Sequence, residues 1–355
     1  MDVKVLLKEA VESKASDIHL TVGTPPVFRI NGSLTRVSLE GQVLPALTQE
    51  DTLQAAQALM TEEHIQLWQQ KGEFDFSYSL PGVGRFRVNV FRQRGCTSLA
   101  LRPVPYKVPR LEELGVPQVV TTFAERANGL VLVAGPTGSG KSTTLAALIN
   151  KINQERSCHI ITLEDPIEYL HQHQQSMVNQ REVGSDTMSL AGAFRACLRQ
   201  DPDVILIGEM RDIETISTAI NAAETGHLVF AALQTNSASQ TIERIIDVFP
   251  PGQQEQIKVQ LSSTLQGVVT QQLLPTADGK GRVLAAEVMI VNPAIRNLIR
   301  EGKTHQMLTV LQTGSRWGMQ TMEMALRELV RSGRINLETA QVYCNDLESF
   351  NKLMG

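Results

Sequence analysis

The sequence predicts an α/β protein whose larger part holds a mainly parallel sheet, preceded by a smaller α+β region with an antiparallel sheet. Beyond about residue 111, short apolar runs of buried-strand type recur between helical stretches, which is typical of a parallel sheet covered on both faces. Before about residue 105, β-prone segments instead alternate polar and apolar residues with a period of two. The four buried runs are residues 130–134, 160–163, 204–207 and 228–233.

Length and composition narrow the class of protein. A chain of 355 residues should hold about two domains. The formal charge of −4 argues against broad nucleic-acid binding, which needs a basic face. No apolar run reaches the ~20 residues of a membrane span, and the first residues lack the layout of a signal peptide. The four cysteines are scattered, which argues against a disulfide framework or a zinc site. We expect a soluble, cytoplasmic protein with no nucleic-acid partner and no membrane span.

The N-terminal region is predicted to alternate helices and short strands. Residues 1–14 place their apolar side chains on one helical stripe. Asn31-Gly32 between β-prone runs predicts a hairpin with a type I′ turn. Thr48 and Thr61 are each expected to cap a helix. The remaining strands are predicted at residues 16–20, 73–78, 85–91 and 97–102, the last three as a meander.

The domain boundaries are expected near a proline-rich segment. Pro103, Pro105 and Pro109 indicate a short, stiff linker. We therefore expect an N-terminal domain over residues 1–105, a linker over 106–112 and a second domain over 113–355. Late in the second domain the pattern predicts a hairpin over 272–290 and helices over 293–302 and 318–333.

A phosphate-binding loop is predicted directly after the first buried run. Residues 135–142 follow the pattern of Gly, four residues, then Gly-Lys-Ser, with a strand before it and a helix after it. Glycines let the backbone curl around phosphates, and the start of the following helix adds positive charge. Lys141 can reach the outer phosphates, and the Ser142 hydroxyl can bind Mg²⁺. The expected nucleotide-binding residues are Gly135, Pro136, Thr137, Gly138, Ser139, Gly140, Lys141, Ser142 and Thr143.

Two acidic residues that follow buried runs are candidates for binding the metal ion or activating water. Glu164 closes the run 160–163, and Glu209 follows the run 204–207 after Gly208. Ligands of parallel sheets bind at the carboxyl ends of the strands, where these side chains should lie. A carboxylate there can hold Mg²⁺ or orient the attacking water.

Basic side chains are candidates for sensing and charge neutralisation. His227 precedes the fourth buried run and is a candidate for phosphate or subunit sensing. The N-terminal region holds several arginines near its last strands, and Arg85 and Arg87 should share one face. Such side chains could act as arginine fingers, which neutralise charge on a transferring γ-phosphoryl group. The arginines concerned are Arg85, Arg87, Arg92, Arg94 and Arg102.

Taken together, these motifs resemble the secretion-superfamily ATPases. Residues 135–142, 164–168, 200–209 and 223–227 stand in the family's order as its Walker A, Asp-box, Walker B and His-box elements. Within that group the chain is similar to the type IV pilus retraction ATPases, in residues 16–20, 179–184 and 318–322 as well. The C-terminal motor signature of that family is matched by Ala294, Ile295, Arg296, Asn297, Leu298, Ile299, Arg300 and Glu301.

The resemblance implies an ATPase with a PAS-like N-terminal domain and a RecA-like P-loop domain, assembled as a homohexamer. It implies ATP and Mg²⁺ as ligands, with Glu164 as general base and with Ser142 and Glu209 binding the metal ion. The candidates for arginine fingers are then Arg87, Arg94 and Arg102. It further implies a motor that drives pilus disassembly from the cytoplasmic side of the inner-membrane base. An inner-membrane platform protein and a paralogous retraction ATPase are the implied partners.

One departure from the family pattern keeps alternatives open. The family carries a second histidine in a His-Thr-Asn-Ser run, and here the run begins with Gln234. Glutamine can donate or accept hydrogen bonds but cannot become a cation. The alternatives are an accessory nucleotide-binding hexamer that modulates a main motor, and a sibling motor for pilus extension or type II secretion. Such siblings usually carry a four-cysteine zinc insertion, which is missing here.

Overall fold

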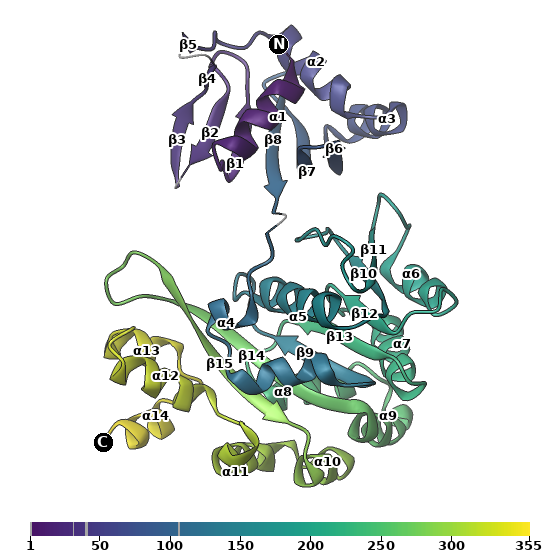
Figure 1. Cartoon of the computed structure of the whole chain (residues 1–355), viewed down its shortest axis with the longest axis vertical. Coiled ribbons are helices and arrows are strands. Elements are labelled where there is room, and N and C mark those ends of the chain that lie inside the picture. The colour runs from purple at the N-terminus through teal and green to yellow at the C-terminus, as the bar shows by residue number, and fades with distance from the viewer. Residues whose placement is uncertain (1, 31, 40–41, 106) are drawn as a thin grey trace. The chain divides into compact units, whose positions relative to one another are not determined.

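The chain divides into two compact units (Figure 1). The computed structural model describes residues 2–30, 32–39, 42–105 and 107–355. The units are Met1–Lys107 and Val108–Gly355. The second unit begins inside the segment predicted as a linker, because Leu111 opens helix α4 (Leu111–Leu114) and is buried in this unit's core.

The first unit is built on a six-stranded antiparallel sheet with the order β3-β2-β1-β8-β7-β6. Its core joins inward-facing strand residues to apolar residues of α1, α2 and α3. The elements are α1 (Val3–Glu12), β1 (Asp17–Leu20), β2 (Val27–Ile30), β3 (Ser33–Arg36), β4 (Ser38–Leu39), β5 (Gln42–Val43), α2 (Gln49–Leu59), α3 (Glu62–Lys71), β6 (Glu73–Leu80), β7 (Gly84–Gln93) and β8 (Cys96–Val104).

Local signals in the first unit are confirmed at several elements. The Thr48 side chain accepts from the backbone N–H of Asp51 in a capping box, and Thr61 accepts from the backbone N–H of His64. Strands β2 and β3 pair as the predicted hairpin, and Gly32 in the connection has φ of 84°. Asn31 lies outside the described residues, so the turn type stays a prediction.

The second unit confirms the predicted α/β class. Its seven-stranded sheet has the order β11-β10-β12-β13-β9-β14-β15, and every neighbouring pair is parallel except β14 with β15. All six residues of β9 (Gly129–Ala134) and of β13 (Leu228–Leu233) are buried, so both faces of the sheet are covered there. The other strands are β10 (His159–Glu164), β11 (Met177–Glu182), β12 (Val204–Ile207), β14 (Leu265–Pro275) and β15 (Arg282–Ile290).

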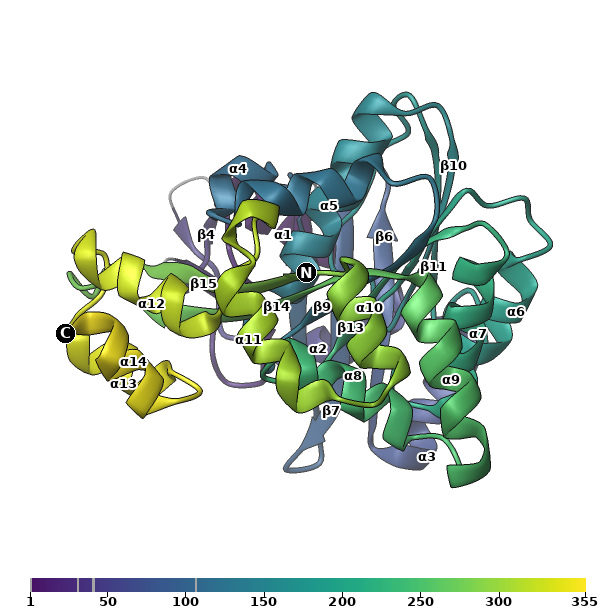
Figure 2. The same cartoon turned by 90° about the horizontal axis from the view of Figure 1, so that it is seen from below.

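Helices surround this sheet, and the last three form a small group of their own. Figure 2 shows α12, α13 and α14 gathered beyond β15, where they share a separate apolar core. The helices are α5 (Lys141–Glu155), α6 (Leu190–Cys197), α7 (Ile213–Glu224), α8 (Ala238–Asp247), α9 (Pro251–Thr264), α10 (Pro293–Arg300), α11 (Met307–Thr313), α12 (Met322–Arg331), α13 (Leu337–Tyr343) and α14 (Leu347–Met354), with 3₁₀ turns η1 (Gln118–Glu125), η2 (Thr304–Gln306) and η3 (Ser315–Trp317). No helix of the described residues is long and apolar enough to cross a membrane.

Three differences from the sequence-based elements concern the sheet of the second unit and the helices that follow it. Strand β11 was not predicted, and β14 begins at Leu265, earlier than the expected hairpin, because it also pairs in parallel with β9. The helix predicted from Gly318 begins at Met322. Gly318 instead closes η3 with φ of 77°, and a Cβ there would lie 2.7 Å from a side-chain atom of Val119.

The contact between Gly267 and Phe123 gives a test of this packing. A Cβ on Gly267 would lie 2.3 Å from Phe123 Cζ and 2.9 Å from the Met289 carbonyl oxygen. We expect Gly267→Ala to lower the free energy of unfolding by about 1–3 kcal/mol, because the buried Phe123 ring must move. Urea unfolding measures the change. The control is Gly252→Ala in α9, where nothing lies within 4 Å of the added methyl group. This control should be neutral or stabilising by up to about 1 kcal/mol, and equal midpoints for the two variants would contradict the described packing.

Candidate functional site

The predicted phosphate loop joins the central strand β9 to α5. Gly140 caps α5 with φ of 91°, a left-handed conformation that favours glycine. At Gly135 the loop is packed so closely on β14 that a Cβ would lie 2.4 Å from the Gln271 carbonyl oxygen. Glycine is therefore needed at both positions to curl the loop at the carboxyl end of the sheet.

Lys141 lies across its own loop. Its Nζ donates to the carbonyl oxygens of Gly135 (2.8 Å) and Pro136 (2.9 Å). Burial lowers the pKa of Lys141, and the charge of Glu209 partly offsets that shift. Within the same loop the Ser139 hydroxyl is buried, and the described residues offer it no hydrogen-bond partner. The Lys141 ammonium group and the unpartnered Ser139 hydroxyl lie in one glycine-rich loop, which is an arrangement suited to binding phosphate.

The two predicted carboxylates lie on neighbouring strands of the sheet. Glu164 ends β10, Glu209 follows β12, and these strands pair in parallel. A Cβ on Gly208 would lie 3.3 Å from Glu164 Cα, so glycine permits this close approach. Arg211 Nη2 donates to Glu209 Oε2 at 2.7 Å.

Glu164 is the buried member of the pair, with 7% of its surface exposed. Thr162 Oγ1 donates to Glu164 Oε1 at 2.7 Å, Gln180 Nε2 donates to the same oxygen at 3.3 Å, and the backbone N–H of Glu168 donates to Oε2 at 3.3 Å. Burial raises the pKa of Glu164 to about 7 and outweighs these hydrogen bonds, which act to lower it. A carboxylate with a pKa near neutrality is suited to act as a general base.

A cavity of about 290 Å³ connects the loop to the two carboxylates. Ser142 and Glu209 both line it, and their hydroxyl and carboxylate oxygens are the donor types that Mg²⁺ prefers. The residues present therefore fit the predicted metal. The residues that line the cavity include Ser142, Glu164, Glu168, Tyr169, Glu209 and Arg211.

Within one subunit, His227 lies at the end of its strand that is far from the phosphate loop. His227 precedes β13, and its neighbour Leu228 pairs with Gly129, the first residue of β9. The loop lies at the opposite end of these strands, six residues or about 20 Å away. The ring Nδ1 of His227 lies 3.0 Å from the Ala222 carbonyl oxygen. Subunit sensing by His227 stays a prediction.

Gln234, in contrast, lies at the edge of the sheet that carries the loop. It follows Leu233, the last residue of β13, whose carbonyl oxygen accepts from the backbone N–H of Gly135 at 3.3 Å. The glutamine that replaces the family's second histidine is therefore the His-box residue near the predicted phosphates.

The three arginine-finger candidates belong to the first unit, and the structure brings only two of them together. Arg87 in β7 pairs directly with Arg102 in β8, and both are exposed. Arg94 lies in the turn between the same strands, with φ of 51°. It is seven residues from Arg87 along an extended chain, or about 20 Å. Arg87 and Arg102 could therefore act on one phosphoryl group together, whereas Arg94 could act only at a separate place, and its role as a finger stays a prediction.

The predicted motor signature lies on α10, away from the loop. Ile295 and Ile299 are fully buried, as expected for one face of an amphipathic helix. On the outer side Asn297 Nδ2 donates to Glu301 Oε1 at 2.7 Å, and Arg300 Nη2 donates to Asn297 Oδ1 at 2.9 Å. These contacts describe a structured polar surface rather than a part of the nucleotide site.

Three residues that the sequence reasoning missed belong to the site. Tyr169 Oη lies 3.0 Å from Thr143 Oγ1 on the helix that follows the loop. Arg211 contacts Glu209, and its position two residues after Glu209 was the signal that could have revealed it. Gln271 Nε2 donates to the buried Thr144 Oγ1 at 2.8 Å. No local signal marks Gln271, because the pairing of β14 with β9 joins distant parts of the chain.

Comparison with known proteins gives consistent matches over nearly the whole chain. The family described as "Type II/IV secretion system protein" matches residues 1–342. A "Twitching motility protein" of Neisseria gonorrhoeae is 46% identical over 98% of this chain and 92% of its own length. The "Type IV pilus retractation ATPase PilT" of Pseudomonas aeruginosa is 46% identical over 99% of this chain and all of its own length. A crystal structure of the pilus retraction motor PilT with bound ADP superposes with a TM-score of 0.91, at 51% identity over 99% of both chains.

The raised pKa of Glu164 predicts a pH-dependent activity. The kcat/KM for ATP hydrolysis reports groups of the ligand-free protein. We expect it to fall as the pH drops below about 7, because the protonated carboxyl can no longer accept a proton. Glu164→Gln should abolish this fall in kcat/KM at low pH. It should also lower turnover by at least the ~10²-fold typical of a lost base.

Glu168→Gln is the matched control for this prediction. The charge of Glu168 contributes to raising the pKa of Glu164. The Glu168→Gln variant should therefore keep Glu164 as the base, and its kcat/KM should begin to fall at a lower pH than that of the parent protein. Full turnover by Glu164→Gln would instead transfer the role of base to Glu209.

Proposed function

The chain belongs to the type II/IV secretion system protein family, and from that premise we propose that it is an ATP-hydrolysing motor that drives type IV pilus retraction. The observation that carries the proposal is the joint geometry of the loop, Glu164 and Glu209 around one cavity at the carboxyl edge of a parallel sheet. Support comes from the likeness to an ADP-bound pilus retraction motor over 99% of both chains.

Different residues of the cavity carry out the separate tasks of ATP hydrolysis: phosphate binding, metal binding and proton transfer. Lys141 turns from its own carbonyl oxygens to the outer phosphates of ATP. Ser142 and Glu209 would hold Mg²⁺, which neutralises charge on the β- and γ-phosphates when it is bound. Glu164 accepts a proton from the water that attacks the γ-phosphorus, and its raised pKa matches that task. Thr162 and Gln180 fix the carboxylate by hydrogen bonds.

The remaining positive charge comes from another subunit. Arg87 and Arg102 form an exposed pair on the first unit and act as fingers on the γ-phosphoryl group of a neighbour. Because each subunit then completes the next one's site, the contact is heterologous and closes by rotation into a ring. We propose a homohexamer, following the family, on the cytoplasmic side of the pilus base, with an inner-membrane platform protein and a paralogous retraction ATPase as partners.

One observation favours a second candidate function. Gln234 lies next to the loop where the family has a histidine, and it cannot supply a positive charge to the phosphates. A weakly active hexamer that binds ATP and modulates a main pilus motor would tolerate this change. The two functions differ in turnover by the purified protein.

The proposal predicts motor activity that depends on this chain's own hydrolysis. Purified protein should hydrolyse Mg-ATP without a second ATPase, and deletion of its gene in the native host should abolish pilus retraction. The parent gene should restore retraction, while Lys141→Ala should not, because a cation on the β/γ-phosphates is lost. ATP binding without turnover by the parent protein would support the accessory function. Normal retraction in the deletion strain would contradict both candidates.

A further inference from the structure

A row of charged residues crosses the sheet of the first unit. Strand register places Arg29 opposite Asp17, and Arg102 opposite Arg87. Ile18 pairs with Leu101, so Asp17 and Arg102 are opposite each other one position further along. Paired residues of neighbouring strands point to the same face. The row therefore reads Arg29, Asp17, Arg102, Arg87 across four adjacent strands, with one acid between three bases.

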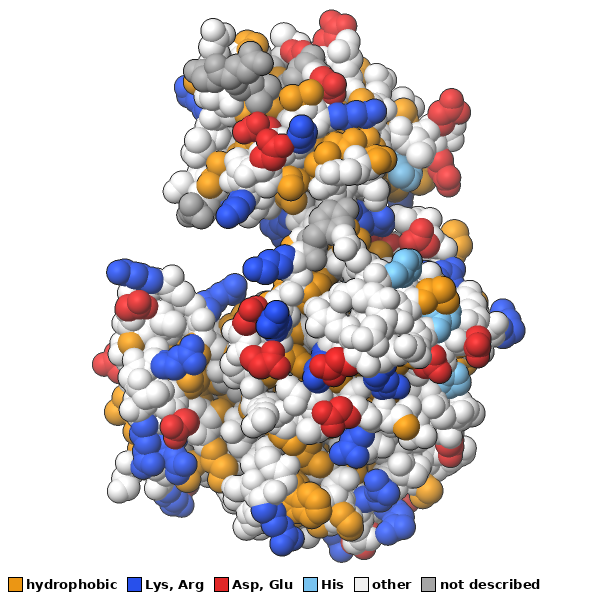
Figure 3. Space-filling view, in the orientation of Figure 1, with side chains coloured by type: hydrophobic (Ala, Val, Ile, Leu, Met, Phe, Trp, Pro, Cys, Tyr) orange, Lys and Arg blue, Asp and Glu red, His pale blue; other side chains and the backbone are white. Residues whose placement is uncertain are grey.

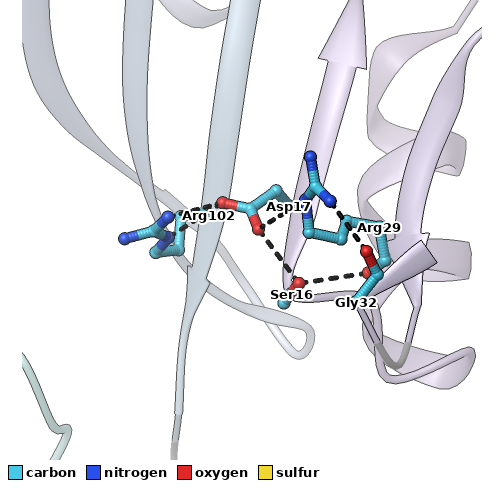
Figure 4. A network of polar contacts seen from close by, with 5 residues as sticks. All are labelled: Ser16, Asp17, Arg29, Gly32 and Arg102. Carbon is cyan, nitrogen blue, oxygen red and sulfur yellow. Dashed lines mark hydrogen bonds and ion pairs between the residues drawn. The ribbon is translucent and has the colours of Figure 1, made fainter. Parts of the chain in front are cut away.

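Asp17 holds the guanidinium group of Arg102 through two hydrogen bonds. Arg102 Nε and Nη2 donate to Asp17 Oδ1 at 3.0 Å and 2.7 Å (Figure 4). The second carboxylate oxygen of Asp17 accepts from Ser16 Oγ at 2.9 Å and lies 3.8 Å from Arg29 Nε. The Asp17 side chain is 17% exposed, whereas that of Arg102 is 68% exposed. The acid is thus fixed in the sheet, while the guanidinium it holds extends into solvent.

The ion pair between Asp17 and Arg102 is expected to contribute little to the free energy of folding. Ion pairs that solvent reaches contribute little to folding, since solvent screens them. Its larger effect is on the conformation of Arg102, whose long side chain would otherwise sample many rotamers. Arg87 stands directly opposite Arg102, and like charges in that position repel. Without Asp17, repulsion and side-chain freedom would both move the Arg102 guanidinium away from a defined position.

We propose that Asp17 is a positioning residue that pre-orients Arg102 toward the γ-phosphoryl group bound by a neighbouring subunit. The inference rests on the proposed function, in which Arg102 acts in trans. Two donors of the guanidinium are committed to Asp17, so the plane of the group is fixed before ATP arrives. Groups held in place in advance contribute more to a transition state than groups that must be ordered during the reaction.

The opposite role is also physically defined and serves as an outcome of the test. Asp17 could compete with the phosphate for Arg102, in which case its removal would raise turnover. The positioning role requires that removal lower turnover while ATP binding by the same subunit, which depends on the loop, stays unchanged.

The first experiment compares Asp17→Asn, Asp17→Ala, Arg102→Ala and the double variant Asp17→Ala with Arg102→Ala. We expect both Asp17 variants to lower kcat by about 10–10²-fold with little change in KM, since a small misplacement of a reacting group has this effect. The double variant should be no slower than Arg102→Ala, because both changes remove the same interaction. Glu12→Gln is the control, because it removes one charge of the exposed Lys8–Glu12 pair in the same unit. Its turnover should match the parent's, and unfolding curves check that every variant is folded.

The second experiment uses mixed rings to place Asp17 on the arginine-donating side. Asp17→Ala subunits mixed with Lys141→Ala subunits should recover part of the activity, because some interfaces pair an intact loop with an intact Asp17–Arg102. Asp17→Ala mixed with Arg102→Ala should show no recovery, since both lack the donated group.

Three results would overturn the inference. Parent-like or raised kcat in Asp17→Ala, with Arg102→Ala strongly impaired, would contradict positioning but leave the finger assignment standing. Recovery between Asp17→Ala and Arg102→Ala would place Asp17 outside the donated group. Full activity of Arg102→Ala would contradict the finger assignment itself and, with it, the role of Asp17.

Discussion

The nucleotide site depends on the parallel register of four buried strands. Strands β9, β10, β12 and β13 all run in one direction, so everything that follows their last residues meets at one edge. The loop, Glu164, Glu209 and Gln234 are brought together in this way from separate parts of the chain. A side chain at Gly135 would collide with β14, and one at Gly208 would crowd the end of β10, so both glycines permit the close spacing of these groups.

Within one subunit, the described residues of the site offer no free cation to balance the negative charge of the γ-phosphoryl oxygens. Lys141 is the cation of the loop, and in this structure it is satisfied by its own carbonyl oxygens. Arg211 lies nearby but is engaged by Glu209.

Hydrolysis builds negative charge on the γ-phosphoryl oxygens, which favours a further cation from outside the subunit. An exposed Arg102 held by Asp17 in the first unit is a suitable donor, and it gives a physical reason for assembly. Figure 3 shows that both acidic and basic side chains are exposed on one face of the second unit.

Local signals made part of this site predictable, and long-range pairing explains the rest. The loop at residues 135–142 and the acids after two apolar runs are short patterns with a direct physical meaning. The distance of His227 from the loop could not be predicted, because the sequence does not give the direction of β13 relative to β9. The pairing of Leu228 with Gly129 decides that question, and it is a tertiary fact. Likewise, alternation along β7 and β8 could not show that Arg102 lies opposite Arg87 while Arg94 occupies the turn. Strand β11 and the contact of Gln271 with Thr144 were missed for the same reason.

The central claim is that one subunit's arginines complete another subunit's site. The most direct measurement is Mg-ATP turnover per subunit as a function of protein concentration, with the size of the assembly determined at each point. We expect specific activity to rise in step with the fraction of subunits in closed rings and nearly to vanish for isolated subunits. Constant turnover per subunit down to concentrations where only monomers are present would contradict it.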